Sequence, residues 1–280
     1  MTQSVVAIVL CAAILHAAWN ALLKSGGDRF RSIVVMSVAS SVACVPVAAY
    51  LPLPSSASWP AILISAAIHV AYNLFLVHAY AHGDLGQVYP IARGSSPLLV
   101  TLGAALLAGE TPSAPALAGI ALVSLGIFSL ARGWTQGASR SGMRAALATG
   151  VSIAAYTVTD GLGARLSQNP ASYAAWLFIL EGVPMPIVYW AVKGWRAPLL
   201  DMRLETGKAA IGGLVSLLAY GMVIWAASIG PMGSVSALRE TSVVFAALLG
   251  RFFLAEELTA GRLASCAAVA LGAVLLGRHV

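Results

Sequence analysis

Ten apolar stretches, separated by short polar turns, follow one another along the chain. About 20 consecutive apolar residues are enough for an α-helix to cross the hydrocarbon core of a bilayer. Lipid offers no partner to backbone N–H and C=O groups, and no strand-like alternation is present, so helices are the expected spanning structure. The predicted spans are residues 4–23, 32–52, 60–81, 86–108, 114–131, 143–164, 171–192, 209–228, 232–254 and 260–277.

The composition agrees with this assignment. Only 9% of the residues are charged and 59% are hydrophobic, whereas about a quarter of a soluble domain is charged. The net charge of +6 comes from a few basic residues in short connections beside the lipid headgroups, and it does not indicate a nucleic-acid partner. The three cysteines show no metal-binding spacing, so neither a metal nor a cofactor is expected. We therefore predict an all-α, multi-pass membrane protein.

Residues 82–131 and 229–278 repeat one pattern. An offset of 147 places Gly83, Gly86, Gly103 and Glu110 on Gly230, Gly233, Gly250 and Glu257, and an offset of 146 places Arg93 on Arg239. This predicts two five-helix repeats, residues 1–131 and 143–280, joined by a loop at 132–142. Because five is an odd number, the second repeat should be inverted in the membrane, with a binding cavity near the midplane where the repeats face each other.

Five charged residues fall inside predicted spans: Arg93, Asp160, Glu181, Arg239 and Glu240. A charge at the centre of a membrane helix costs at least ~2.5 kcal/mol, so such residues normally face a cavity or a partner. They are candidate binding and coupling groups. A purely structural role is the alternative, in which the two arginines form ion pairs with Glu181 or Glu240.

Polar and aromatic residues recur at helical spacings of three and four, which place side chains on one face of a helix. The candidate cavity residues on these faces are His16, Trp19, Asn20, His69, Tyr72, Asn73, Tyr89, Arg93, Ser96, Tyr156, Asp160, Tyr220, Trp225, Arg239 and Ser242. For the two histidines, hydrogen bonding between helices is an equally good interpretation. Pro184 and Pro186 predict a kink in the seventh span. Glu110 and Glu257 lie in turns, where they are expected to cap helix starts.

The opening motif His16-Ala-Ala-Trp-Asn20 and the turns Ala108-Gly-Glu110 and Ala255-Glu-Glu257 resemble the drug/metabolite transporter superfamily, in particular its ten-span EamA-like family. The resemblance implies an inner-membrane carrier that exports amino acids or other small metabolites. It also implies a cavity built from spans 1, 3, 4, 6, 8 and 9, with spans 5 and 10 at the periphery, and both termini in the cytoplasm. The basic connections argue for the opposite orientation by the positive-inside rule, so orientation stays open.

The expected function is alternating-access transport of a small polar metabolite that carries a carboxylate or phosphonate group. Arg93 and Arg239 would bind the acid group, and Glu181, Glu240 or Asp160 would carry a coupling proton. The expected partners are a small-molecule substrate and the lipid bilayer, with a monomer or homodimer as the assembly. Alternatives are an exporter of cationic or amphipathic drug-like compounds, a passive channel, and an intramembrane enzyme. The sequence contains neither the H-E-x-x-H nor the G-x-S-x-G motif of known hydrolases, which argues against the intramembrane enzyme.

Overall fold

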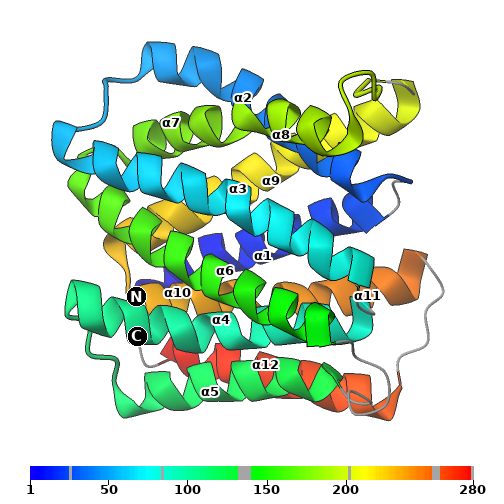
Figure 1. Ribbon diagram of the computed structural model, residues 1–280. Coiled ribbons are helices and arrows are strands. Elements are labelled where there is room, and N and C mark those ends of the chain that lie inside the picture. The colour runs from blue at the N-terminus through cyan, green and yellow to red at the C-terminus, as the bar shows by residue number, and fades with distance from the viewer. Residues whose placement is uncertain (25–26, 83–84, 132–139, 201–202, 254–258, 279–280) are drawn as a thin grey trace.

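A computed structural model of the protein describes residues 1–24, 27–82, 85–131, 140–200, 203–253 and 259–278, without some side chains beside the gaps (Figure 1). Over these residues the chain is helical and contains no strand. The elements are α1 (Gln3–Lys24), α2 (Arg29–Tyr50), η1 (Ser56–Ser58), α3 (Trp59–His82), α4 (Leu85–Ala108), α5 (Ala114–Phe128), η2 (Ser129–Ala131), α6 (Arg140–Leu166), α7 (Pro170–Gly182), α8 (Pro184–Lys193), α9 (Arg203–Ile229), α10 (Met232–Arg239), α11 (Ser242–Phe253) and α12 (Ala260–Arg278).

Nine helical stretches among the described residues are long and apolar enough to cross a membrane. Each predicted span falls on helix, and only α6 is not among the nine. α6 carries Tyr156, Thr157, Thr159 and Asp160 in its middle, and these polar groups lower its mean hydropathy. The polar content that weakens α6 as a membrane segment is the content expected of a helix that faces a cavity.

Two of the predicted spans are divided. The seventh is divided into α7 and α8 at Val183, directly before Pro184, as the proline pair predicts. The span predicted over 232–254 corresponds to a candidate membrane span at Met232–Arg251, within which α10 ends at Arg239 and α11 begins at Ser242. Between them the amides of Glu240 and Thr241 bond to carbonyls three residues back, both at 3.1 Å, instead of four. Such a short 3₁₀ stretch inside a helix often marks a functional hinge or a sequence under strain.

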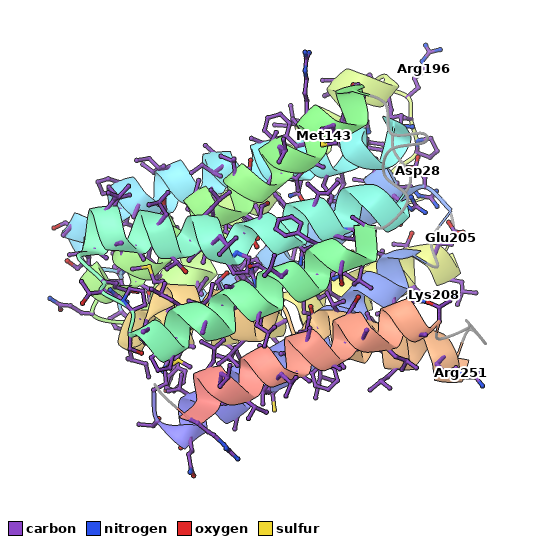
Figure 2. All side chains as sticks on the ribbon, turned by 90° about the horizontal axis from the view of Figure 1, so that it is seen from below. Asp28, Met143, Arg196, Glu205, Lys208 and Arg251 are labelled. Atoms are coloured by element: carbon purple, nitrogen blue, oxygen red, sulfur yellow. The ribbon has the colours of Figure 1, made fainter. Side chains whose placement is uncertain are left out.

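The outer surface of the bundle is apolar. Large aliphatic side chains such as Leu106 and Leu107 are more than two-thirds exposed, which suits a surface covered by lipid tails. The charged side chains Asp28, Arg196, Glu205, Lys208 and Arg251 gather at one end of the bundle (Figure 2). An apolar surface therefore surrounds the helices, and charged side chains gather at one of their ends.

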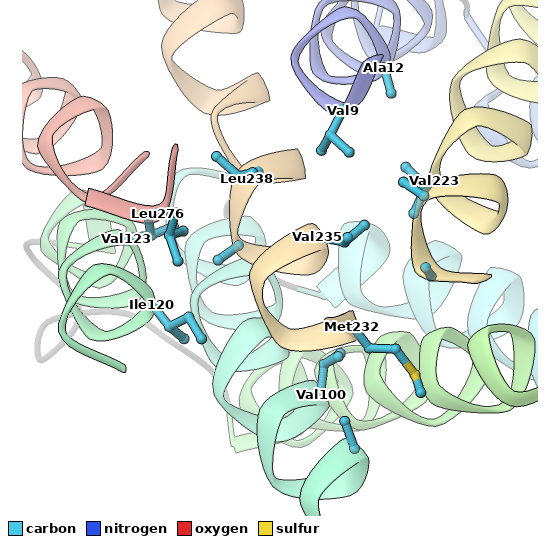
Figure 3. Packing of buried hydrophobic residues seen from close by; sticks show 14 of the residues in the cluster. Val9, Ala12, Val100, Ile120, Val123, Val223, Met232, Val235, Leu238 and Leu276 are labelled. Atoms are coloured by element: carbon cyan, nitrogen blue, oxygen red, sulfur yellow. The ribbon is translucent and has the colours of Figure 1, made fainter. Parts of the chain in front are cut away.

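α10 lies at the centre of the packing. All eight of its residues are buried, and Met232, Val235 and Leu238 project into a cluster with side chains of α1, α4 and α9 (Figure 3). At the edge of the molecule, α5 and α12 pack side by side (Figure 1), as the resemblance implies for spans 5 and 10. A Cβ on Gly272 would lie 2.8 Å from the carbonyl oxygen of Gly119, so small residues set this close approach.

α2 and α9 also meet backbone to backbone. A Cβ on Gly213 of α9 would lie 2.9 Å from the Cα of Met36 in α2. We expect Gly213→Ala to lower the free energy of unfolding by about 1–3 kcal/mol, because overpacking forces the helices apart. Gly221→Ala in the same helix is the matched control: its Cβ meets nothing within 4 Å, and alanine favours helix by up to ~1 kcal/mol. Thermal unfolding in detergent measures both, and equal melting temperatures would contradict the packing argument.

Candidate functional site

A cavity of about 90 Å³ lies inside the bundle, between helices that precede residue 131 and helices that follow residue 140. This volume is small and has room for only a few water molecules. Its lining combines aromatic, hydroxyl and charged groups. The lining residues are His16, Trp19, Ile33, Met36, Ser37, Ser40, His69, Tyr72, Asn73, Leu76, Tyr156, Phe178, Glu181, Ser216, Tyr220 and Arg239.

Aromatic rings from three helices form one wall of the cavity. The ring of His69 on α3 stacks on Tyr156 of α6, with the ring centroids 4.1 Å apart. Tyr72 and Tyr220 meet Tyr156 edge to face, at 5.5 and 5.6 Å. Edge-to-face and offset contacts of this kind fix ring positions, so the wall is preorganised before any ligand arrives.

α1 adds a second aromatic pair. The indole N–H of Trp19 donates to Nδ1 of His16 at 3.2 Å, so a neutral His16 carries its own proton on Nε2. Asn20 does not join this face of the cavity. Its side-chain amide donates back to the carbonyl of His16 at 2.7 Å, within the same helix.

Two groups of opposite charge line the cavity. Glu181, in α7, is nine-tenths buried, and its Oε1 accepts a long hydrogen bond of 3.3 Å from the amide of Asn73. Arg239, at the last residue of α10, is 2% exposed. Its Nε and Nη2 have no hydrogen-bond partner among the described residues, although Nη2 lies 3.5 Å from Glu240 Oε1. The cavity therefore presents both a carboxylate and an incompletely bonded guanidinium.

A second buried arginine, Arg93, does not line the cavity. Arg93 Nε is 2.6 Å from Oε2 of the fully buried Glu240, and Arg93 Nη2 donates to Ser242 Oγ at 3.2 Å. The break between α10 and α11 places Glu240 between the two arginines. Two guanidiniums therefore share one carboxylate, and Arg239 is the more distant of the two.

Asp160 is also held away from the cavity. It is 1% exposed, and its two oxygens accept hydrogen bonds from Tyr173 at 2.9 Å and from Tyr220 at 2.5 Å. The contact with Tyr220 connects Asp160 to the aromatic wall. Asp160 thus fixes the position of a lining residue without lining the cavity itself.

The structure brings together eight of the predicted cavity residues and one predicted coupling group. These are His16, Trp19, His69, Tyr72, Asn73, Tyr156, Tyr220 and Arg239, together with Glu181. Predicted residues that are placed elsewhere are Asn20, Arg93, Ser96, Asp160, Trp225, Ser242 and Glu240. Ser96 bonds its own helix, and Trp225 is exposed on the outside of α9. The side chain of Tyr89 lies outside the described residues.

The sequence interpretation missed the contribution of α2. Ile33, Met36, Ser37 and Ser40 all line the cavity. The only sequence signal was a pair of serines three residues apart in an apolar span. The contribution of the fourth span, implied by the resemblance, is absent from the described lining, and α2 and α7 contribute instead. Among the described residues, no three His, Cys, Asp or Glu side chains cluster closely enough to hold a metal ion.

Comparison with known sequences decides the family. The sequence model of the EamA-like transporter family matches residues 3–132 and, a second time, residues 140–278. The chain belongs to the EamA-like transporter family. The EamA-like resemblance of the opening motif and the two turns is thereby confirmed, and family membership indicates a multi-pass membrane transporter.

The fold of this EamA-like protein is also known from solved structures, of which 28 chains match. One, described only as "Crystal structure of protein", superimposes with a TM-score of 0.77 at 18% sequence identity. The match covers 98% of this chain and 96% of that chain, so the two share the whole fold. No curated protein matches the sequence.

Proposed function

We propose that this EamA-like protein is a secondary transporter of a small zwitterionic metabolite of the amino-acid class. It would export by alternating access of two inverted five-helix repeats, residues 1–131 and 143–280, in the plasma membrane. The observation that carries the proposal is that Arg239 and Glu181, of opposite charge, line one cavity. A zwitterion offers a partner to each of them.

The acid group of the substrate would bind Arg239. A buried guanidinium N–H without a hydrogen bond costs about 1–3 kcal/mol, and Nε of Arg239 is such an atom, while Nη2 has only the 3.5 Å ion pair with Glu240. A carboxylate or phosphonate matches the planar fork of the guanidinium and can bond to both atoms. Glu240 cannot do so as well, because it is turned toward Arg93, with 2.6 Å to that residue against 3.5 Å to Arg239.

The amino group would bind between Glu181 and the aromatic wall. The rings of Tyr72, Tyr156 and Tyr220 lie close together, and an ammonium near ring faces gains about 0.5–2 kcal/mol in a desolvated site. Of the three candidate coupling acids, Glu240 is paired with Arg93 and Asp160 with two tyrosine hydroxyls. Glu181 alone lines the cavity, so it is our candidate for a proton exchanged against the substrate.

A carrier of drug-like cations is the second candidate function. It is favoured by the combination of Glu181 with an aromatic wall, which suits a hydrophobic amine without any acid group. In that case Arg239 would contribute only to the ion pair with Glu240. Membership in a transporter family favours both functions over intramembrane catalysis.

Thermal stabilisation of the purified protein distinguishes these functions. We expect alanine or serine to raise the melting temperature, since a ligand at 100 times its Kd stabilises the folded state by ~2.7 kcal/mol. Arg239→Gln should lose this stabilisation and also any response to acetate or methylphosphonate. Arg251→Gln makes the same charge change on an exposed residue and should respond like the wild type. Stabilisation by tetraphenylphosphonium alone, unchanged in Arg239→Gln, would contradict the zwitterion proposal and support the cation carrier.

A further inference from the structure

Ion pairs connect the N-terminal half (residues 1–131) to the C-terminal half (residues 143–280) at three depths. Arg93–Glu240 lies in the interior, Glu110–Arg165 at the end of the bundle where α6 and α9 finish, and Arg31–Glu205 at the opposite end, where α2 and α9 begin. Figure 1 shows that these helix termini lie at opposite ends, and Figure 2 labels Glu205 at its end. The interior pair belongs to the site described above, whereas the two terminal pairs have no role in it.

The pair at the end of α6 is part of a larger junction. Arg165 Nη2 is 2.5 Å from Glu110 Oε1 and donates to the carbonyl of Gly230 at 2.8 Å, while Arg165 Nε donates to the carbonyl of Ala227 at 3.2 Å. The second oxygen of Glu110 accepts the backbone N–H of Met232 at 2.9 Å. Glu110 therefore caps a helix start, as its turn position predicts, but the helix is α10 of the other half.

This junction is coupled to the site through α10. Glu110 binds the first residue of α10, and the last residue of the same helix is Arg239. Eight residues at 1.5 Å each make α10 only ~12 Å long, and its complete burial leaves it little freedom to bend. Beside the junction is a second cavity of about 480 Å³, whose lining includes Glu110, Arg165, Thr101 and Ser234.

The pair at the opposite end is simpler. Arg31, in the first turn of α2, contacts Glu205 in the first turn of α9, and both are partly exposed. Asp28, which caps α2, lies 3.6 Å from Lys193 at the end of α8 and reinforces the same junction. Each end is thus held by charges contributed by both halves.

We propose that Glu110–Arg165 and Arg31–Glu205 are opposed latches, one for each end of the transport path, and that both are fastened in this structure. This inference rests on the proposed alternating-access function. Both pairs are partly exposed, and ion pairs near the surface are weaker than buried ones, which suits gates that must open in every transport cycle. Releasing Glu110 would free the start of α10 and open the path beside Ser234, and releasing Glu205 would separate α2 from α9 beside Ile33.

Cysteine accessibility tests the latches without any substrate. The native cysteines are replaced by alanine, and a single reporter is introduced in protein reconstituted into lipid nanodiscs: Ser234→Cys beside the first latch or Ile33→Cys beside the second. Both reporter positions are buried. Glu110→Gln should speed labelling of the first reporter by a hydrophilic maleimide about tenfold, the scale of one charge-assisted hydrogen bond, and leave the second unchanged. Glu205→Gln, with the same charge change, should do the reverse.

The outcomes separate the latches from the transport proposal. If Glu110→Gln does not fold, Arg165→Gln is used in its place, because it removes the partner of Glu110 in the C-terminal half. Equal acceleration at both reporters, or none at either, would overturn the latch proposal even if the protein transports amino acids. The expected one-sided pattern in a protein that moves no amino acid would support the latches and contradict the assigned substrate.

Discussion

Arg93→Ala is expected to lower the free energy of unfolding by about 3 kcal/mol, the largest loss of stability for any single change at the site. Arg93 is the closest partner of Glu240, whose side chain is completely buried. Removing one member of a buried ion pair leaves an uncompensated charge, which costs about 3–5 kcal/mol. Arg239 stays within 3.5 Å of Glu240 and compensates in part, which places the expected value at the lower limit. Thermal or denaturant unfolding in detergent measures the loss.

A double variant tests the reason for that loss. Arg93→Met/Glu240→Leu removes both charges, and apolar replacement of a whole buried pair is often neutral or stabilising. We expect it to recover most of the stability, whereas Arg251→Ala, at an exposed arginine, should change little. If Arg93→Ala melted like the wild type, the pair would not be a structural element, and Arg93 would return as a candidate for substrate binding.

Arg239→Gln is expected to reduce the initial rate of uptake about 10- to 150-fold at low substrate concentration. This range corresponds to the loss of one charge-assisted hydrogen bond, ~1.5–3 kcal/mol. Glutamine keeps a planar donor group but loses the charge and the fork geometry that recognise an acid group. Glu240 still has Arg93, so the folded structure should persist. Uptake of radiolabelled alanine into proteoliposomes measures the effect.

The matched control is Arg251→Gln, which makes the same replacement at an exposed position of α11. It should transport like the wild type. Normal uptake by Arg239→Gln would show that the guanidinium at the cavity is not the acid-binding group, and the assignment of substrate orientation would have to be abandoned.

Apolar length predicted where helices lie, because each span must be long enough to cross lipid and must end at polar turns. It did not predict the break at Glu240–Thr241. Proline marked the break before Pro184 in advance, since it lacks an N–H, but no residue type forces the second break. The 3₁₀ turn there brings Glu240 between two arginines, which is a tertiary contact that a local pattern does not contain.

The candidate site was predictable where one helix carries several cavity residues. The spacing of His69, Tyr72 and Asn73 placed all three on one face, and the structure puts all three on the cavity wall. Trp225 shows the limit of such reasoning. It lies five residues after Tyr220, whereas residues on one face of a helix are three or four apart. Trp225 is therefore exposed on the outside of α9, while Tyr220 lines the cavity.

Partners across the two halves were not predictable from the sequence. The turn position of Glu110 indicated a helix cap, yet the nearest helix start, that of α5, is capped by Ser113. Glu110 instead reaches α10 of the other half. The serines of α2 were missed for a similar reason: hydroxyl groups in apolar helices commonly bond to their own backbone, as Ser40 does with Met36. Which face of α2 meets the cavity depends on its packing against α9.

Counterflow in proteoliposomes tests the central claim, a carrier that binds a small zwitterion between two halves. Vesicles loaded with an unlabelled amino acid, chosen by its thermal stabilisation of the protein, are diluted into a trace of the same radiolabelled compound. A carrier should take up label faster in loaded than in empty vesicles, reach a transient excess, and saturate with concentration. Flux that rises linearly with concentration and is indifferent to the vesicle contents would contradict alternating access and indicate a passive channel.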